Sequence, residues 1–232
     1  MNFADAFSIL YEDNHLLIVN KAAGVLVQGD QTGDIPLVEH CKAYLKEKYN
    51  KPGAVFLGVV HRLDRPVSGV VVLARTSKAL SRMNKLFSDR ETTKTYFAIV
   101  QNRPPAGEGT LVNWLIKDEA RNKTTSYDTD TPGAMRAELN YRLLRPTDRY
   151  WLLQVNPLTG RPHQIRVQLS TVGCPIVGDL KYGAEKASDN PGIYLHARRL
   201  EFVHPVKKER VSFTAPFPPY RLWKGMQKSF NE

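Results

Sequence analysis

A charged hexapeptide, HRLDRP at residues 61–66, lies between two apolar runs at 55–60 and 70–74. Apolar runs of this length predict buried strands, and a charged cluster between them is costly unless it faces a cleft. Asp64 has an arginine close on either side, and this positive charge favours the ionised form of the carboxylate. An ionised aspartate suits a nucleophile or a charge stabiliser better than a general acid. The alternative is an ordinary Arg–Asp turn at a strand end, and the segment by itself slightly favours the turn.

A second candidate is the segment LTGRPHQIR at residues 158–166. A Thr-Gly loop that opens a helix presents unpaired backbone N–H groups, which are a natural site for phosphate. His163 and Arg166 are three residues apart and would share a face of the helix predicted over residues 162–172. A semi-buried Arg166 needs a carboxylate partner, and Asp64 is the candidate. The alternative is a surface helix with a basic rim.

The third candidate is Tyr96, in the run KTYFAIV at residues 94–100, which predicts a strand. A tyrosine on a strand usually belongs to the core or to a sheet surface. In a cleft, its ring could stack on a nucleobase and its hydroxyl could reach a proton. The run by itself leaves both interpretations open.

The sequence pattern around these residues predicts an α/β (α+β) chain. We expect a mixed, largely antiparallel sheet with flanking helices, which would position the candidate residues. Helical spacing predicts helices over residues 36–49, 77–88 and 162–172, the second with Ser77 as its N-cap. Paired strands are expected over 8–19 (with a turn at 12–14), over 137–144 with 150–155, and over 193–203 with 210–214. The polar segment 102–134 is expected to be a surface excursion with one short strand. No linker or repeat divides the chain, so we expect a single domain over residues 1–232.

Composition limits the classes of partner. The chain has 232 residues, 42% of them hydrophobic and 24% charged, which is ordinary for a globular protein. No stretch approaches the roughly 20 apolar residues of a membrane span, and the first residues do not resemble a signal peptide. We therefore expect a cytoplasmic protein with no membrane partner. The sequence does not indicate an oligomeric state, and a monomer is our working assumption. The net charge of +10 favours a polyanionic partner such as nucleic acid.

The cysteines and histidines predict neither a disulfide framework nor a metal site. The two cysteines are far apart in sequence, and the six histidines are dispersed without the spacing of metal ligands. We expect no metal.

The three candidate segments together resemble one family, the RluA-type pseudouridine synthases. HRLDRPVSGVVVLAR resembles the family signature H-R-L-D-R-x-T-S-G followed by an apolar strand. LTGRPHQIRVQL resembles its T-G-R-x-H-Q-I-R-V-H-L segment, and KTYFAIV resembles its K-x-Y strand. YEDNHLLIVNKAAGV, CPIVGDLKYG and LHARRLEFVHP are further matches, so the similarity runs from about residue 8 to the end.

The resemblance implies an RNA-modifying enzyme with a central RNA-binding cleft, which isomerises uridine in transfer or ribosomal RNA without a cofactor or a metal. It implies that Asp64 is the catalytic aspartate, Tyr96 the active-site tyrosine, and Arg166 the arginine that pairs with the aspartate. The residues expected to shape the site or contact a stem-loop of the RNA are His61, Arg62, Leu63, Arg65, Lys94, Arg161 and His163.

This sequence departs from the family pattern at a few positions. Val67 stands where the family has Thr, Gln168 stands where it has His, and residues 207–209 replace a T-G-E turn. Because none of these is a proposed catalytic residue, we expect them to affect substrate preference more than activity.

Two other functions are compatible with parts of the pattern. A non-catalytic RNA-binding or chaperone protein could keep the same fold, although a pure binder has no need of Asp64, Tyr96 and Arg166 together. A metal-free ribonuclease could use His61 and His163 as acid and base, and it would cleave the RNA chain.

Overall fold

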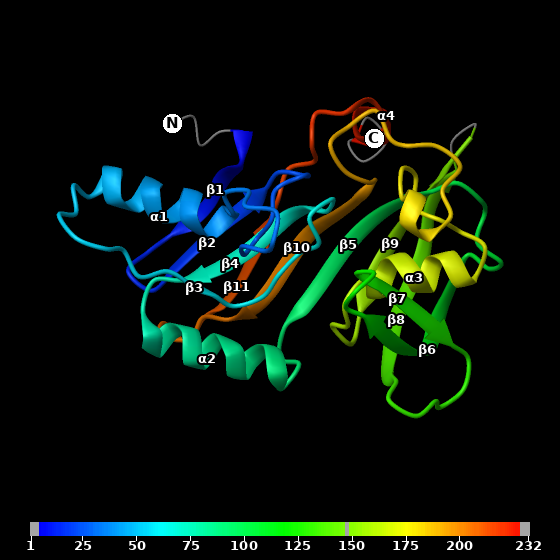
Figure 1. Ribbon diagram of the computed structural model, residues 1–232, viewed down its shortest axis with the longest axis horizontal. Coiled ribbons are helices and arrows are strands. Elements are labelled where there is room, and N and C mark those ends of the chain that lie inside the picture. The colour runs from blue at the N-terminus through cyan, green and yellow to red at the C-terminus, as the bar shows by residue number, and fades with distance from the viewer. Residues whose placement is uncertain (1–4, 147–148, 228–232) are drawn as a thin grey trace. The chain divides into compact units, whose positions relative to one another are not determined.

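The computed structural model in Figure 1 describes residues 5–146 and 149–227 of the chain. The chain forms two compact units. The first comprises Met1–Thr93 with Ala197–Pro218, and the second comprises Lys94–His196 with Pro219–Glu232. The expectation of a single domain over residues 1–232 stays a prediction. The mixed α/β class with a large, mainly antiparallel sheet is confirmed.

In the first unit, β1, β2, β4 and β10 are neighbours in that order, β11 pairs with β10, and the short β3 pairs with β4. The pairs β1–β2, β2–β4, β3–β4 and β10–β11 are antiparallel. The bounds of these strands are Phe7–Glu12 (β1), Leu16–Lys21 (β2), Gly58–Val59 (β3), Ser68–Ala74 (β4), Leu195–Val203 (β10) and Arg210–Thr214 (β11).

Two helices cover the strands of the first unit. Helix α1 (Leu37–Lys48) and helix α2 (Ser77–Ser88) lie along opposite faces of these strands in Figure 1. Residues 16–19 and 70–74 are consequently buried whichever way their side chains point. A strand covered on both faces reads as a continuous apolar run rather than an alternating one, as the sequence does here.

The second unit carries an antiparallel set of strands in the order β5–β9–β8–β6–β7. The bounds of its strands are Thr93–Val100 (β5), Glu108–Asp118 (β6), Lys123–Tyr127 (β7), Met135–Pro146 (β8) and Trp151–Pro157 (β9). Helix α3 (Gln164–Thr171) packs on β6 and β7, and its Val167 is buried with Leu115, Ala137 and Tyr182. A short 3₁₀ turn at Leu180–Tyr182 and helix α4 (Arg221–Gln227) complete this unit.

The predicted strand pairs and the helices over residues 36–49 and 77–88 are confirmed, but the prediction for 102–134 is wrong. That segment contains the eleven-residue strand β6, which pairs with β7 on one side and β8 on the other. The apolar run at residues 111–116 indicated only a short strand, whereas β6 extends beyond that run into polar residues at both ends.

Two predicted helix starts shift in the structure. Thr76, rather than Ser77, is the N-cap of α2, and its side chain accepts a hydrogen bond from the Ala79 N–H at 3.1 Å. Helix α3 begins at Gln164 instead of residue 162, because His163 adopts a left-handed conformation with φ 53°. His163 is therefore the cap of the helix and does not share a helical face with Arg166.

Gly69, at the start of β4, is required by its backbone. Its φ is +121°, and a Cβ added there would overlap the backbone of Ala197. Both the conformation and the close approach exclude a side chain. The Ser-Gly pair that follows the charged hexapeptide is thus explained by the packing of β4.

We predict that Gly69→Ala lowers the free energy of unfolding by about 3–5 kcal/mol, because backbone strain and overpacking add. Urea denaturation followed by circular dichroism would measure it. Gly53→Ala is the matched control, since a Cβ there meets nothing within 4 Å and should change stability by less than about 0.5 kcal/mol. Equal stability of the two variants would contradict the account of Gly69.

Candidate active site

Asp64 lies in the connection between β3 and β4, in the first unit. Leu63 and Val67 on either side of it are buried, while Asp64 itself is half-buried. The Val67 N–H donates to the Asp64 carbonyl at 3.0 Å, which closes a tight turn around the carboxylate. The predicted site residue Leu63 therefore acts here as an apolar anchor of the turn.

Arg65 ties this turn to the loop that follows β2. Its carbonyl accepts from the Gly24 N–H at 2.8 Å, and its Nε donates back to the Gly24 carbonyl at 3.0 Å. Its Nη2 lies 2.6 Å from a carboxylate oxygen of Asp34. The backbone and side chain of Arg65 thus hold two loops together, and its predicted contact with substrate stays a prediction.

Lys21, the last residue of β2, is the main contributor to this site that the sequence analysis missed. Its side chain is fully buried, and its Nζ donates to the carbonyls of Ala22 at 2.9 Å, Val25 at 2.7 Å and Arg65 at 3.2 Å. Three acceptors match the three N–H donors of an ammonium group. Burial lowers the pKa of Lys21 to about 7, and the negative charge of Asp64 opposes that shift. A buried cation therefore lies within electrostatic reach of the candidate catalytic carboxylate.

His61 and Arg62 differ in their surroundings. The Nε2 of His61 accepts a hydrogen bond from the Val72 N–H at 3.1 Å, so this nitrogen carries no proton. Its ring stacks on Phe87 with centroids 4.7 Å apart and planes 18° apart. Arg62 is exposed. The position of His61 suits an anchor of the loop better than the acid or base that a ribonuclease would need.

Tyr96 and Lys94 lie on β5, in the second unit. Both are half-buried, and Tyr96 is in register with Val155 of β9. The Nδ2 of Asn156 donates to the Lys94 carbonyl and to Thr95 Oγ1, both at 3.0 Å. This cross-strand amide fixes the start of β5, and therefore the place from which the Tyr96 side chain leaves the strand.

Arg166 is buried in the second unit and is paired with Asp179. Its Nε donates to Asp179 Oδ2 at 2.7 Å and its Nη2 donates to Asp179 Oδ1 at 2.9 Å. The Arg166 Cζ also lies 4.9 Å from the ring centroid of Tyr182. The predicted need for a carboxylate partner is thus met by Asp179, which the sequence analysis did not name. The predicted pairing with Asp64 joins residues of different units and stays a prediction.

The Thr-Gly loop before α3 is partly occupied by its own side chains. The Arg161 N–H donates to Gln164 Oε1 at 3.0 Å, and the Arg161 Nε donates to the Arg136 carbonyl at 3.1 Å. His163 Nδ1 lies 2.7 Å from Tyr182 Oη. One N–H of the predicted phosphate site is therefore already taken, although the Arg161 side chain keeps its charge near the loop.

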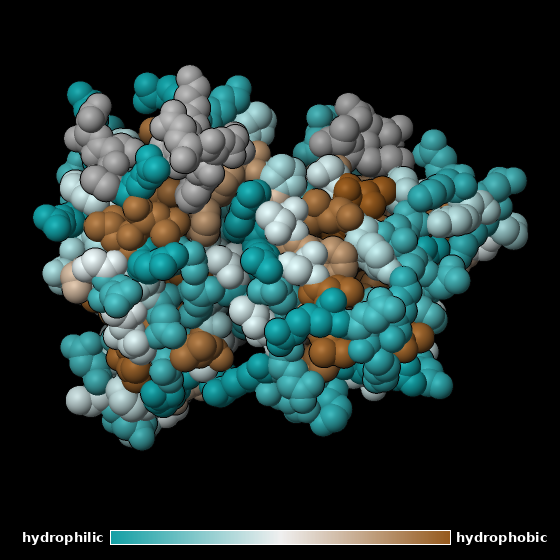
Figure 2. Space-filling model, turned by 180° about the vertical axis from the view of Figure 1, so that it is seen from behind, coloured by the Kyte–Doolittle hydropathy of each residue, from teal (hydrophilic) through white to brown (hydrophobic). Residues whose placement is uncertain are grey.

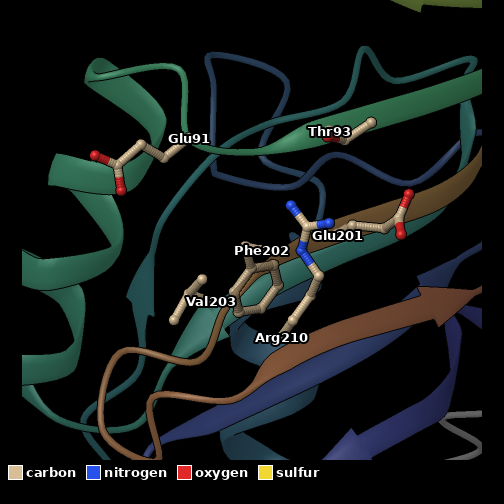
Figure 3. Close-up of a pocket in the computed structure, with 6 residues that line it drawn as sticks. All are labelled: Glu91, Thr93, Glu201, Phe202, Val203 and Arg210. Carbon is tan, nitrogen blue, oxygen red and sulfur yellow. The ribbon is translucent and has the colours of Figure 1, made fainter.

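Other candidate sites are sparse in the part of the chain that the structure describes. No group of three or more His, Cys, Asp or Glu residues there could hold a metal ion, and no helix there could cross a membrane. A small pocket of the first unit, shown in Figure 3, contains none of the predicted site residues. Its lining consists of Glu91, Thr93, Glu201, Phe202, Val203 and Arg210. On the face shown in Figure 2, hydrophobic residues gather in separate patches among hydrophilic ones.

Comparisons with known proteins agree on one family. A protein-family model described as RNA pseudouridylate synthase matches residues 15–171 of the chain. Ribosomal large subunit pseudouridine synthase C of Vibrio cholerae is 33% identical over 214 residues, which cover 90% of this chain and 65% of that protein. The chain thus spans slightly less than two thirds of that relative. The tRNA pseudouridine synthase C of Vibrio vulnificus is 32% identical over 240 residues, covering 96% of this chain and 94% of that protein.

A solved structure is also similar. The protein titled Human RNA Pseudouridylate Synthase Domain Containing 4 superimposes with a TM-score of 0.79 at 25% sequence identity. The superposition covers 95% of this chain and 92% of that one.

We predict that Lys21→Met loosens the turn that carries Asp64, because it removes three hydrogen bonds from a charged donor. Such bonds contribute roughly 1.5–3 kcal/mol each, so amide exchange in segments 22–27 and 62–67 should accelerate at least about tenfold. Hydrogen–deuterium exchange with mass spectrometry measures it. Lys42→Met on the surface of α1 is the control and should leave both segments unchanged. Wild-type protection in the Lys21 variant would show that this lysine does not hold the turn.

Proposed function

Because the chain belongs to the RNA pseudouridylate synthase family, we propose that it isomerises uridine to pseudouridine in RNA. The observation that carries this proposal is the family match over residues 15–171, a range that contains Asp64, Tyr96 and Arg166. These are the three residues whose types and segments first pointed to the chemistry. The remaining question for each is what it does in the reaction.

The reaction conserves atoms and needs no external oxidant or reductant. The N1–C1′ bond of uridine breaks, the base rotates, and C5 bonds to C1′. C5 then loses its hydrogen as a proton, and N1 gains one. We assign to Asp64 the role of the essential carboxylate, which either attacks the nucleoside directly or removes a sugar proton to give a glycal-like intermediate.

The surroundings of Asp64 support this assignment. The buried neighbours Leu63 and Val67 fix the turn, so the carboxylate is held by a rigid backbone. The buried amine of Lys21 lies within electrostatic reach of the carboxylate, inside the first unit. Arg166 would keep the carboxylate charged and oriented during the reaction.

We assign to Tyr96 the role of stacking on the target base. The base must leave its stack before a carboxylate can reach its sugar, at a cost of a few kcal/mol in a paired region. Stacking on an aromatic ring returns about 1–3 kcal/mol per base. The Tyr96 hydroxyl would assist the movement of the proton from C5.

The substrate is proposed to be a stem-loop of ribosomal or transfer RNA. The printed names of the relatives are those of ribosomal large subunit and tRNA pseudouridine synthases. The net charge of +10 supports binding to a polyanion, and affinity should fall as salt rises. We propose that the protein acts as a monomer in the cytoplasm and that it uses neither metal nor cofactor.

We predict that the protein releases tritium to water from RNA labelled at uridine C5, in the presence of EDTA and without added cofactor. Asp64→Asn should lower the rate on the order of 10³–10⁴-fold, because the group is essential to the chemical step. Asp89→Asn, at an exposed aspartate after α2, is the matched control and should keep the wild-type rate.

The outcomes of this assay separate the candidate functions. No release from any RNA class, with RNA still bound, would favour the non-catalytic RNA-binding or chaperone alternative. Shortening of the RNA during incubation would instead indicate a ribonuclease.

We predict that two variants of Tyr96 separate stacking from proton movement. Tyr96→Ala should weaken RNA binding about 5- to 150-fold, which corresponds to the stacking energy of one base. Tyr96→Phe should keep the affinity, because the ring remains, and should lose turnover. Filter binding and single-turnover tritium release measure the two quantities. Wild-type affinity in Tyr96→Ala would argue against a stacked base at this position.

A further inference from the structure

We propose that Asp179 and Tyr182 are positioning residues that fix the direction of the Arg166 guanidinium for the reaction. This inference rests on the proposed function, because it gives a purpose to the arrangement of Arg166. It adds two residues to the site that neither the hexapeptide nor the Thr-Gly loop supplies. All three residues belong to the second unit.

The contact between Asp179 and Arg166 is bidentate and dry. The two oxygens of Asp179 accept from Nε and Nη2 of Arg166 at 2.7 and 2.9 Å. The side chains are 2% and 6% exposed, respectively. A fork-to-fork pair of this kind fixes the plane and the rotation of the guanidinium as well as its position.

The bidentate contact also selects the edge of Arg166 that remains for other partners. A guanidinium has five N–H donors, and Asp179 uses the Nε donor and one Nη2 donor. Three N–H donors are not used by Asp179: the second donor of Nη2 and the two of Nη1. Asp179 also compensates the buried charge of Arg166. Without this carboxylate, Arg166 would be an unpaired buried cation, which is strongly destabilising.

Tyr182 gives Arg166 a second contact, through its ring. The Cζ of Arg166 lies 4.9 Å from the ring centroid of Tyr182, as in a cation–π contact. The Tyr182 hydroxyl accepts from the Thr124 N–H at 2.8 Å and lies 2.7 Å from His163 Nδ1. Burial raises the pKa of Tyr182, and its hydroxyl is hydrogen-bonded to His163 Nδ1. The ring is thereby tied both to β7 and to the cap of α3.

The loop that carries Asp179 is bonded to the strand that carries Tyr96. The Val177 N–H donates to the Ile99 carbonyl of β5 at 2.9 Å, and Val100 forms a bridge with Ile176. The Asp179 N–H then donates to the Ile176 carbonyl at 3.0 Å. Arg166 is therefore oriented by a loop whose position is set by β5, which places two proposed active-site residues on one rigid support.

Gly178 lets this loop approach its neighbour. Its φ is +88°, and a Cβ there would lie 2.6 Å from the Cβ of Ser188. The tight fit restricts where Asp179 can move.

The alternative interpretation is that Asp179 and Arg166 form a buried pair that only stabilises the second unit. Variants of Asp179 separate this structural role from a positioning role.

Asp179→Asn is the principal variant, because asparagine keeps the shape but offers one acceptor where Arg166 presents two donors. We expect single-turnover tritium release to fall on the order of 10²-fold, the effect of a small misplacement of a reacting group. The RNA dissociation constant should stay within about threefold, since neither residue is proposed to bind RNA. Circular dichroism at the assay temperature confirms that the variant is folded.

The same substitution in an Arg166→Met background tests whether Asp179 acts through Arg166. We expect Arg166→Met and Arg166→Met/Asp179→Asn to have equal rates per folded protein, because there is no guanidinium left to position. A further loss of rate in the double variant would overturn the proposal, and so would a wild-type rate in Asp179→Asn.

Tyr182 supplies a second test if Asp179→Asn does not fold. Tyr182→Phe keeps the ring below Arg166, whereas Tyr182→Leu removes it, so the leucine variant should be at least threefold slower at equal RNA affinity. Equal rates of these two variants would overturn the proposal.

The wild type and Asp64→Asn are assayed in parallel. An inactive wild type would overturn the proposed function and this inference together, whereas an active wild type with an inactive Asp64→Asn confines any failure to Asp179 and Tyr182.

Discussion

Buried positive charge is the constraint on which the rest of this structure depends. Lys21 in the first unit and Arg166 in the second are both nearly inaccessible, and an unpaired buried cation costs several kcal/mol. The chain compensates them by different means. Lys21 is surrounded by three backbone carbonyls, whereas Arg166 receives a full carboxylate from Asp179. Each solution determines the conformation of a loop, and those loops carry or support the proposed catalytic groups.

The difference between the two solutions has a chemical consequence. The carbonyls that hold Lys21 are neutral, so its ammonium form keeps a net charge that attracts Asp64; burial lowers the pKa of Lys21 to about 7, so this charge is lost as the pH rises above neutral. An arginine and its carboxylate partner together carry no net charge. Such a pair therefore acts on other groups mainly through hydrogen bonds whose direction the carboxylate has fixed. The first unit therefore contains a lysine near the proposed catalytic carboxylate, and the second contains an arginine whose direction is fixed by Asp179.

The sequence predicted those parts of the fold and the site whose signal is local. Hairpins and amphipathic helices follow from periodicity, and Asp64 stood out because its charged segment interrupts two apolar runs. Strand β6 was predicted too short, because polar residues at both of its ends extend it beyond the apolar run at 111–116. Lys21 and Asp179 were missed because their roles depend on burial, which arises only when strands and loops pack. A lysine that ends the apolar run of β2 was a usable signal, whereas Asp179 lies thirteen positions from Arg166 across a loop with no periodic pattern.

The two single-residue departures from the family pattern acquire a meaning from this packing. Val67 is buried beneath the turn of Asp64, where an apolar side chain anchors the loop. Gln168 is fully buried, and its Nε2 donates to Asn113 Oδ1 at 2.8 Å and to the Leu111 carbonyl at 3.2 Å, which ties α3 to β6. Neither side chain reaches the surface, so both contribute to support of the site, and the expectation that these positions affect substrate preference stays a prediction. They belong to the scaffold that holds Asp64 and Arg166, and changes there should be felt first in the rigidity of those two residues.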